Sequence, residues 1–156
     1  AAYQSAGDWT GVLFAVQSIG SILWALVLPL FRNNKVGYSV SLLLGAVGFV
    51  STWFIHDQYM LFVSFLLIGC AWAAMLALPF TILTNALTGG HMGTYLGLFN
   101  GTICLPQIIA AALGGLILSL FPPTTGEAAP EAYMLVLAGF LLFAGAACVF
   151  VIKEKK

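Results

Sequence analysis

Apolar and polar positions alternate along this chain in long blocks rather than residue by residue. Five apolar runs of about 20 residues or more are separated by short polar stretches, such as residues 32–35 and 56–58. A helix rises about 1.5 Å per residue, so each run can cross the roughly 30 Å hydrocarbon core of a bilayer. Because unpaired backbone groups are costly in lipid, we expect each run to be helical. The pattern predicts an all-α integral membrane protein with five transmembrane helices, over residues 9–31, 36–55, 59–83, 93–121 and 132–152.

The composition agrees with a membrane protein and excludes several other classes. The chain is 62% hydrophobic and 6% charged, whereas soluble proteins carry about 25% charged residues. Its formal net charge is zero, so no basic surface indicates a nucleic-acid partner. The composition therefore predicts that the chain is embedded in a lipid bilayer.

The basic residues predict how the chain is oriented in the membrane. If the run 9–31 enters from outside, the alternating loops bring all five basic residues to one side. By the positive-inside rule this side is cytoplasmic. We therefore expect a multi-pass protein of the inner or plasma membrane with a cytoplasmic C-terminus, an exterior Ala1 and further spans upstream. Trp9, Trp53 and Tyr59 then fall near the outer ends of the helices, as interfacial aromatic residues do. The five basic residues are Arg32, Lys35, Lys153, Lys155 and Lys156.

The run 93–121 carries features that a simple lipid anchor does not need. Gly93, Gly97 and Gly101 recur every four residues, a small-residue ridge that allows close helix packing. Asn100 and Gln107 lie seven residues apart and project from nearly the same face. These amides either hydrogen-bond neighbouring helices or line a cavity for a neutral polar ligand.

Polar residues and prolines distinguish the apolar runs from one another. Pro106 crowds the preceding turn and predicts a kink, and Pro79 is a second candidate hinge, although prolines are also tolerated in membrane helices. Gln17 lies near the centre of the first run, and Trp72 lies deep in the third, where an indole can stack on a ligand. Polar groups in lipid are expensive unless they face the bundle interior. We therefore expect the first, third and fourth runs to line the interior, with residues 36–55 and 132–152 packed outside.

Residues for enzymatic chemistry are not visible in the pattern. No Asp, Glu, Lys, Arg or His lies in the middle of a run, and no Ser/His/Asp, metal-ligand or phosphate-cradling set occurs. We expect no catalytic residue, no metal and no cofactor. Cys70, Cys104 and Cys148 lie in apolar runs without metal-ligand spacing, and we expect buried thiols that behave as small hydrophobic residues.

One family shows a similar pattern. Gly93, Gly97, Asn100, Pro106 and Gln107, in the order G-x3-G-x2-N-x5-P-Q, resemble a late helix of the sucrose and maltose transporters. These belong to the glycoside–pentoside–hexuronide:cation symporter group of the major facilitator superfamily. Residues 69–87 are similar to the preceding helix of those carriers, and the first run is similar to their eighth helix. The resemblance covers essentially the whole chain and implies helices eight to twelve of a twelve-helix carrier, that is, part of a C-terminal half.

The resemblance also implies a function. The substrate would be an α-glucoside such as maltose or sucrose, carried with a proton or sodium ion that the missing N-terminal half binds. Asn100, Gln107 and Gln17 would hydrogen-bond the sugar hydroxyls, and Trp72 would offer a stacking surface. The first run lacks the polar pattern of plant sucrose carriers, which leaves the sugar open. Two alternatives are a stand-alone scaffold subunit of a membrane complex and a carrier for another polar solute.

Overall fold

The described part of the chain forms five long helices. The computed structural model describes residues 2–87, 91–120 and 130–151, and no strand occurs within these ranges. All five helices are long and apolar enough to cross a membrane, which confirms the all-α prediction at this level. They are α1 (Ala2–Val27, continued by the short helix η1, Leu28–Leu30), α2 (Asn34–Phe54), α3 (Leu61–Ala86), α4 (Met92–Leu120) and α5 (Pro130–Cys148, continued by η2, Val149–Val151).

Local sequence accounts for where the helices begin and continue. Helix α1 begins before residue 9, where the predicted helix starts. The prediction missed its first turns because they carry the polar residues Gln4 and Asp8 and so lie outside the apolar run. Helix α2 begins at a conventional cap, where the Asn33 side chain accepts a hydrogen bond of 2.9 Å from the backbone N–H of Lys35. Helices α3 and α4 continue through Pro79 and Pro106 respectively.

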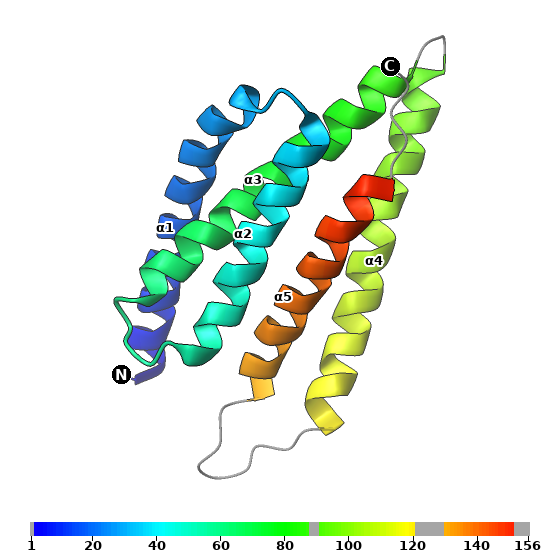
Figure 1. The fold of residues 1–156 in the computed structure, drawn as a ribbon. Helices are drawn as coiled ribbons and strands as arrows, with labels where there is room; N and C mark the ends of the chain where they lie inside the picture. The colour runs from blue at the N-terminus through cyan, green and yellow to red at the C-terminus, as the bar shows by residue number, and fades with distance from the viewer. Residues whose placement is uncertain (1, 88–90, 121–129, 152–156) are drawn as a thin grey trace.

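The helices pack in an order that differs from their order in the sequence. Helix α1 packs on α3, α3 on α2, and α2 on α5, whereas α4 lies beside α5 with sparse contact (Figure 1). Two small clusters of buried side chains form the core. One lies between the end of α1 and α3 and contains Leu28 and Leu78; the other joins α2 to the end of α5 through Leu42 and Val149.

Small polar residues hold the neighbouring helices together. The Ser51 and Ser64 hydroxyls are 2.8 Å apart and join α2 to α3. The Ser39 hydroxyl donates to the Ala146 carbonyl oxygen of α5 at 3.0 Å. Such hydrogen bonds and close approaches between small residues are the usual means by which helices associate in lipid.

The expected division into interior and peripheral helices is wrong for α2 and α4. Helix α2, predicted to pack outside, is the most buried of the five, because serines and glycines along it admit α3 and α5. Helix α4, predicted to line the interior, has no buried residue between Met92 and Leu116. The number of strongly polar residues in a run therefore does not predict how deeply that helix is buried.

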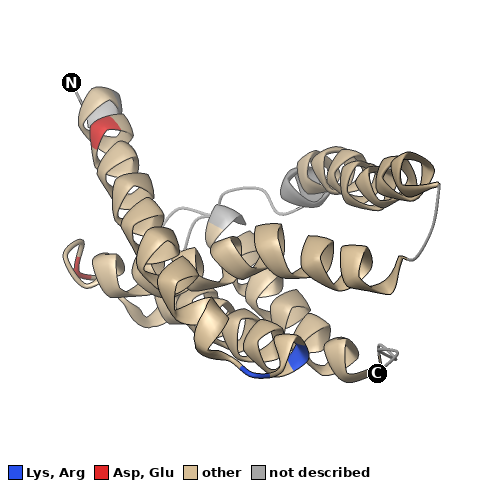
Figure 2. Ribbon diagram, turned by 90° about the horizontal axis from the view of Figure 1, so that it is seen from above, with Lys and Arg blue, Asp and Glu red and all other residues tan. Residues whose placement is uncertain are grey.

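Charges and aromatic residues are distributed between the two ends of the bundle. Asp8 and Asp57 lie at the end where α1 and α3 begin, while Arg32 and Lys35 lie at the opposite end, beside the α1–α2 connection (Figure 2). Aromatic residues gather at the acidic end: the ring centroids of Trp9 and Tyr59 are 5.7 Å apart, and Trp53 and Tyr133 form a similar pair at 4.9 Å. This arrangement is typical of residues at a membrane–water interface.

Replacing Ser41 by alanine will destabilise the contact between α1 and α2. Ser41 is fully buried, and its hydroxyl accepts a hydrogen bond of 2.8 Å from the Trp24 indole N–H. Because the alanine variant leaves this N–H without its partner, we expect the free energy of unfolding to fall by about 1–2 kcal/mol. Unfolding in mixed micelles measures it. Ser18→Ala is the control, because the exposed Ser18 hydroxyl bonds only to the Phe14 carbonyl oxygen within its own helix; equal losses in the two variants would contradict the prediction.

Candidate functional site

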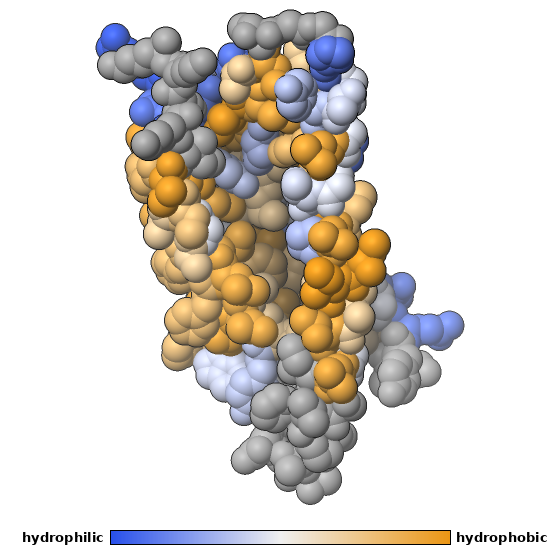
Figure 3. Space-filling model, turned by 90° about the vertical axis from the view of Figure 1, so that its right-hand side faces the viewer, coloured by the Kyte–Doolittle hydropathy of each residue, from blue (hydrophilic) through white to orange (hydrophobic). Residues whose placement is uncertain are grey.

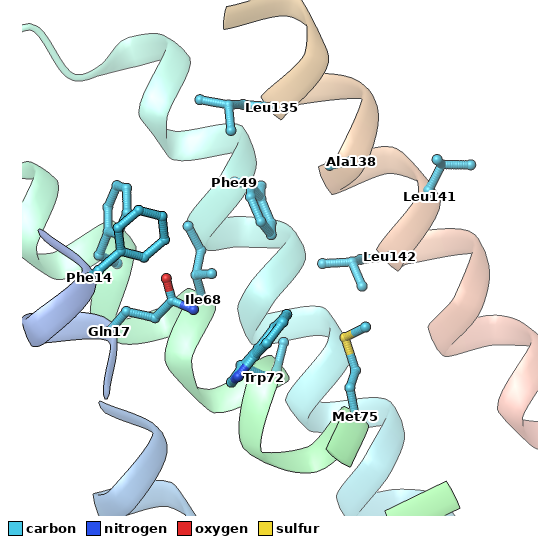
Figure 4. Close-up of a pocket in the computed structure, with 12 residues that line it drawn as sticks. Phe14, Gln17, Phe49, Ile68, Trp72, Met75, Leu135, Ala138, Leu141 and Leu142 are labelled. Atoms are coloured by element: carbon cyan, nitrogen blue, oxygen red, sulfur yellow. The ribbon is translucent and has the colours of Figure 1, made fainter. Parts of the chain in front are cut away.

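A groove of about 500 Å³ lies among the described helices. Side chains from four helices line it, and α4 contributes none (Figure 4). Viewed from the side on which α4 lies, the surface of the molecule is hollowed along much of its length (Figure 3). The lining residues come from α1 (Phe14, Gln17), α2 (Phe49), α3 (Phe65, Ile68, Ala71, Trp72, Met75) and α5 (Leu135, Ala138, Leu141, Leu142).

Two residues predicted from the sequence as substrate contacts, Gln17 and Trp72, share this groove. Their side chains point into it from α1 and α3 (Figure 4). Trp72 is 51% exposed within the chain, so one face of its indole is open. Neither side chain hydrogen-bonds to another residue that the structure describes, so the amide and the indole N–H remain available to a ligand.

The rest of the groove is apolar, which the sequence analysis did not foresee. Phe14 and Phe65 meet edge to face, with their ring centroids 6.3 Å apart, and form part of the wall. Phe49 and Leu142 approach from α2 and α5 (Figure 4). In the sequence these residues look like the lipid-facing side chains around them, and only the packing of the helices separates the two groups.

The other two predicted contacts, Asn100 and Gln107, lie outside the groove. Both are exposed on α4, and neither hydrogen-bonds to another described residue. The interpretation that they bond neighbouring helices is therefore not realised within the described part of the chain. Their proposed contact with a ligand stays a prediction, because α4 is separate from the groove that holds Gln17 and Trp72.

The glycine ridge of α4 packs against no helix in the described residues. A Cβ atom added to Gly93, Gly97 or Gly101 would meet nothing within 4 Å. The ridge is therefore available for close packing, but the described helices do not use it. Pro79 is partly buried in α3 and Pro106 is exposed in α4, and their role as hinges stays a prediction.

Cysteines and other metal-binding residues form no cluster in the described ranges. No group of three His, Cys, Asp or Glu residues is close enough there to hold a metal ion. The prediction that all three cysteines are buried is wrong: Cys70 is half-buried, and Cys104 and Cys148 are exposed. An apolar run can face lipid as well as the protein core, so hydropathy alone could not separate these two environments.

Gln17 and Trp72 give an otherwise apolar groove two groups that can bind a ligand. An amide supplies both donors and an acceptor, while an indole supplies a flat apolar face and one N–H donor. No protein-family model, no curated protein and no solved structure matches this chain. We therefore infer the function of the chain from its residues and their geometry.

Proposed function

We propose that this chain is part of a secondary membrane carrier for a sugar of the α-glucoside class, such as maltose or sucrose. One observation carries the proposal: Gln17 and Trp72, expected from the sequence to contact the same substrate, lie on different helices and line one groove. The groove lies among helices that are long and apolar enough to cross a membrane, which supports a carrier for a solute.

The groove residues suit the chemistry of a sugar ring. A pyranose has apolar C–H faces and a rim of hydroxyl groups that both donate and accept hydrogen bonds. The exposed face of Trp72 can stack on the C–H face of the sugar, and the Gln17 amide can hydrogen-bond its hydroxyl groups. Binding sites for small molecules commonly combine apolar walls with a few such polar groups.

In the proposed carrier, transport depends on parts of the protein beyond these residues. Two halves of a carrier rock about a midplane site and expose it alternately to each side of the membrane. The proton or sodium ion that drives uptake would bind outside the described helices. The cytoplasm would lie on the side of Arg32 and Lys35, in accordance with the positive-inside rule.

A binding measurement tests the proposal directly. Maltose is titrated into the protein in lipid nanodiscs while tryptophan fluorescence is recorded. We expect a saturable change that disappears in Trp72→Phe and persists in Trp53→Phe, because Trp53 lies at the aromatic end of the bundle, outside the groove. An emission spectrum that maltose and sucrose leave unchanged at saturating concentration would contradict the proposal.

Replacing Asn100 by alanine tests whether α4 also contributes to the site. If the Asn100 amide bonds a sugar hydroxyl, the variant loses one hydrogen bond, and sugar uptake at low concentration should fall about 3- to 10-fold. Membrane insertion should be unchanged, because the amide bonds to no other described residue. Leu98→Ala, at a position 70% exposed on the same helix, is the matched control. Normal uptake by the Asn100 variant would remove this residue from the site.

A second candidate function, a scaffold subunit of a membrane complex, is favoured by the exposure of α4. A helix with no buried residue between Met92 and Leu116 and with an open glycine ridge is suited to packing against another protein. The mass of the native polypeptide, detected with an antibody against its lysine-rich C-terminus, distinguishes the two functions. A polypeptide of about the length of these 156 residues favours the subunit, and a much longer one favours the carrier.

A further inference from the structure

Helices α1 and α3 cross with their backbones in direct contact at two glycines. A Cβ atom on Gly20 would lie 2.6 Å from the Leu66 carbonyl oxygen, and one on Gly69 would collide with the Gln17 carbonyl oxygen. Real Cβ atoms essentially never approach other atoms to less than 3.0 Å. The separation of the two helices at this point therefore depends on the absence of a side chain on either glycine.

A serine fixes the register of the same crossing. The Ser21 hydroxyl lies 2.9 Å from the Gly69 carbonyl oxygen of α3 and 3.1 Å from the Gln17 carbonyl oxygen of its own helix. Since both acceptors belong to the crossing, the hydroxyl proton is held between the two helices. Sliding or rotation of α1 against α3 breaks the bond to Gly69.

The two polar residues of the groove lie one helical turn from these glycines. Gln17 precedes Gly20 by three positions, and Trp72 follows Gly69 by three, so each shares a helix face with its glycine. The backbone of Gln17 is itself one surface of the contact. A change in the separation of the helices therefore moves the Gln17 amide relative to the Trp72 indole.

We propose that the crossing at Gly20 and Gly69, held by Ser21, sets the distance between Gln17 and Trp72 and thereby which sugars the groove accepts. This inference rests on the proposed function for its ligand. Gly20, Gly69 and Ser21 are positioning residues, since they act through the two side chains that contact the sugar.

Cross-linking measures the spacing without any ligand. Cysteines replace Gln17 and Trp72 in a chain whose three native cysteines are serines, and bifunctional thiol reagents of graded length are applied in membranes. Because overpacking displaces backbones, Gly20→Ala should lower the yield with the shortest effective reagent about threefold or more and raise it with longer ones. Gly11→Ala, where a Cβ would meet nothing within 4 Å, should change neither.

Further variants keep this test decisive if one of them fails to fold. Gly69→Ala introduces a stronger clash than Gly20→Ala, so the Gly20 variant decides if the Gly69 protein does not insert. Ser21→Ala should broaden the range of reagents that react, whereas Ser18→Ala should not, because the Ser18 hydroxyl bonds only within α1. An unchanged preference for reagent length in both Gly20→Ala and Ser21→Ala would overturn the inference.

Sugar affinity provides the second measurement, in chains that retain Gln17 and Trp72. We expect Gly20→Ala to raise the Kd for maltose about 3- to 10-fold, the effect of losing one hydrogen bond, and to alter the ratio of the maltose and glucose Kd values. Partial misfolding lowers the number of sites and leaves Kd unchanged. If the parent chain binds no sugar, the proposed function fails, whereas the cross-linking result still decides the positioning role.

Discussion

Leucine in place of Gly48 will separate α2 from α3 and lower the free energy of unfolding by about 3 kcal/mol, the upper end of the usual cost of overpacking. A Cβ atom at this position would lie 2.8 Å from the Ser64 carbonyl oxygen and 3.0 Å from Cγ1 of Ile68. The same turn carries the hydrogen bond between Ser51 and Ser64, which a separated pair of helices cannot keep. The leucine side chain has no space in this contact, so α2 must move as a whole.

Detergent-induced unfolding, followed by circular dichroism in mixed micelles, measures this loss. Gly97→Leu is the matched control, because a Cβ on Gly97 meets nothing within 4 Å and this helix makes only sparse contact with the bundle. The control should unfold within about 0.5 kcal/mol of the parent, as surface substitutions usually do. Similar losses in the two variants would show that the contact between α2 and α3 is not the tight one described.

Removing both polar residues of the groove will nearly abolish sugar binding. Gln17→Ala and Trp72→Ala should each weaken maltose binding about 3- to 10-fold, through the loss of a hydrogen bond in the first and of a stacking surface in the second. If the two effects are independent, the double variant should bind about 10- to 100-fold more weakly than the parent. The loss should be smaller if one sugar ring contacts both residues. Titration calorimetry in nanodiscs measures the four affinities of the cycle.

Leu26→Ala is a suitable control for the double variant. Leu26 belongs to α1 but is 72% exposed and does not line the groove. Its replacement removes a comparable apolar side chain and should leave the affinity unchanged. If the two single variants bind maltose as tightly as the parent, the groove is not the sugar site, whatever the parent affinity.

Hydropathy and length were sufficient to predict the helices themselves. Each apolar run became one helix, because lipid leaves the backbone no other economical way to satisfy its hydrogen bonds. The largest error was at the start of α1, where Gln4 and Asp8 are helical although polar. Polar residues can extend a helix beyond the hydrocarbon core at little cost. Hydropathy does not reveal that such residues are helical.

The order of packing could not be predicted in the same way. Helix α2 was expected outside the bundle because it lacks large polar residues, yet Ser39, Ser41 and Gly45 make it the most buried helix. Ser41, Gly45 and Gly48 lie three or four positions apart, so they share a helix face and were a usable signal. In lipid, close approach and short hydrogen bonds decide which helices associate, whereas the apolar side chains contact lipid and protein almost equally well.

The candidate site was predicted in part. Gln17 and Trp72 lie in one groove, whereas Asn100 and Gln107 lie on a separate helix. Spacing along a helix shows which residues share a face, and Asn100 and Gln107 satisfy that test. It does not show which helix the face meets, because this depends on the packing of helices far apart in the sequence.

The packing of α1 on α3 rather than on α2 has a consequence for biosynthesis. The main partner of α1 is synthesised only after the whole of α2, so α1 is complete before this partner exists. At about 5–20 residues per second, this interval lasts about 3–11 s. During that time Ser21 has no carbonyl of α3 to bond, and Gly20 has no backbone of α3 to pack against. The contacts of α1 and α2 with α3 therefore form only after α3 has been synthesised.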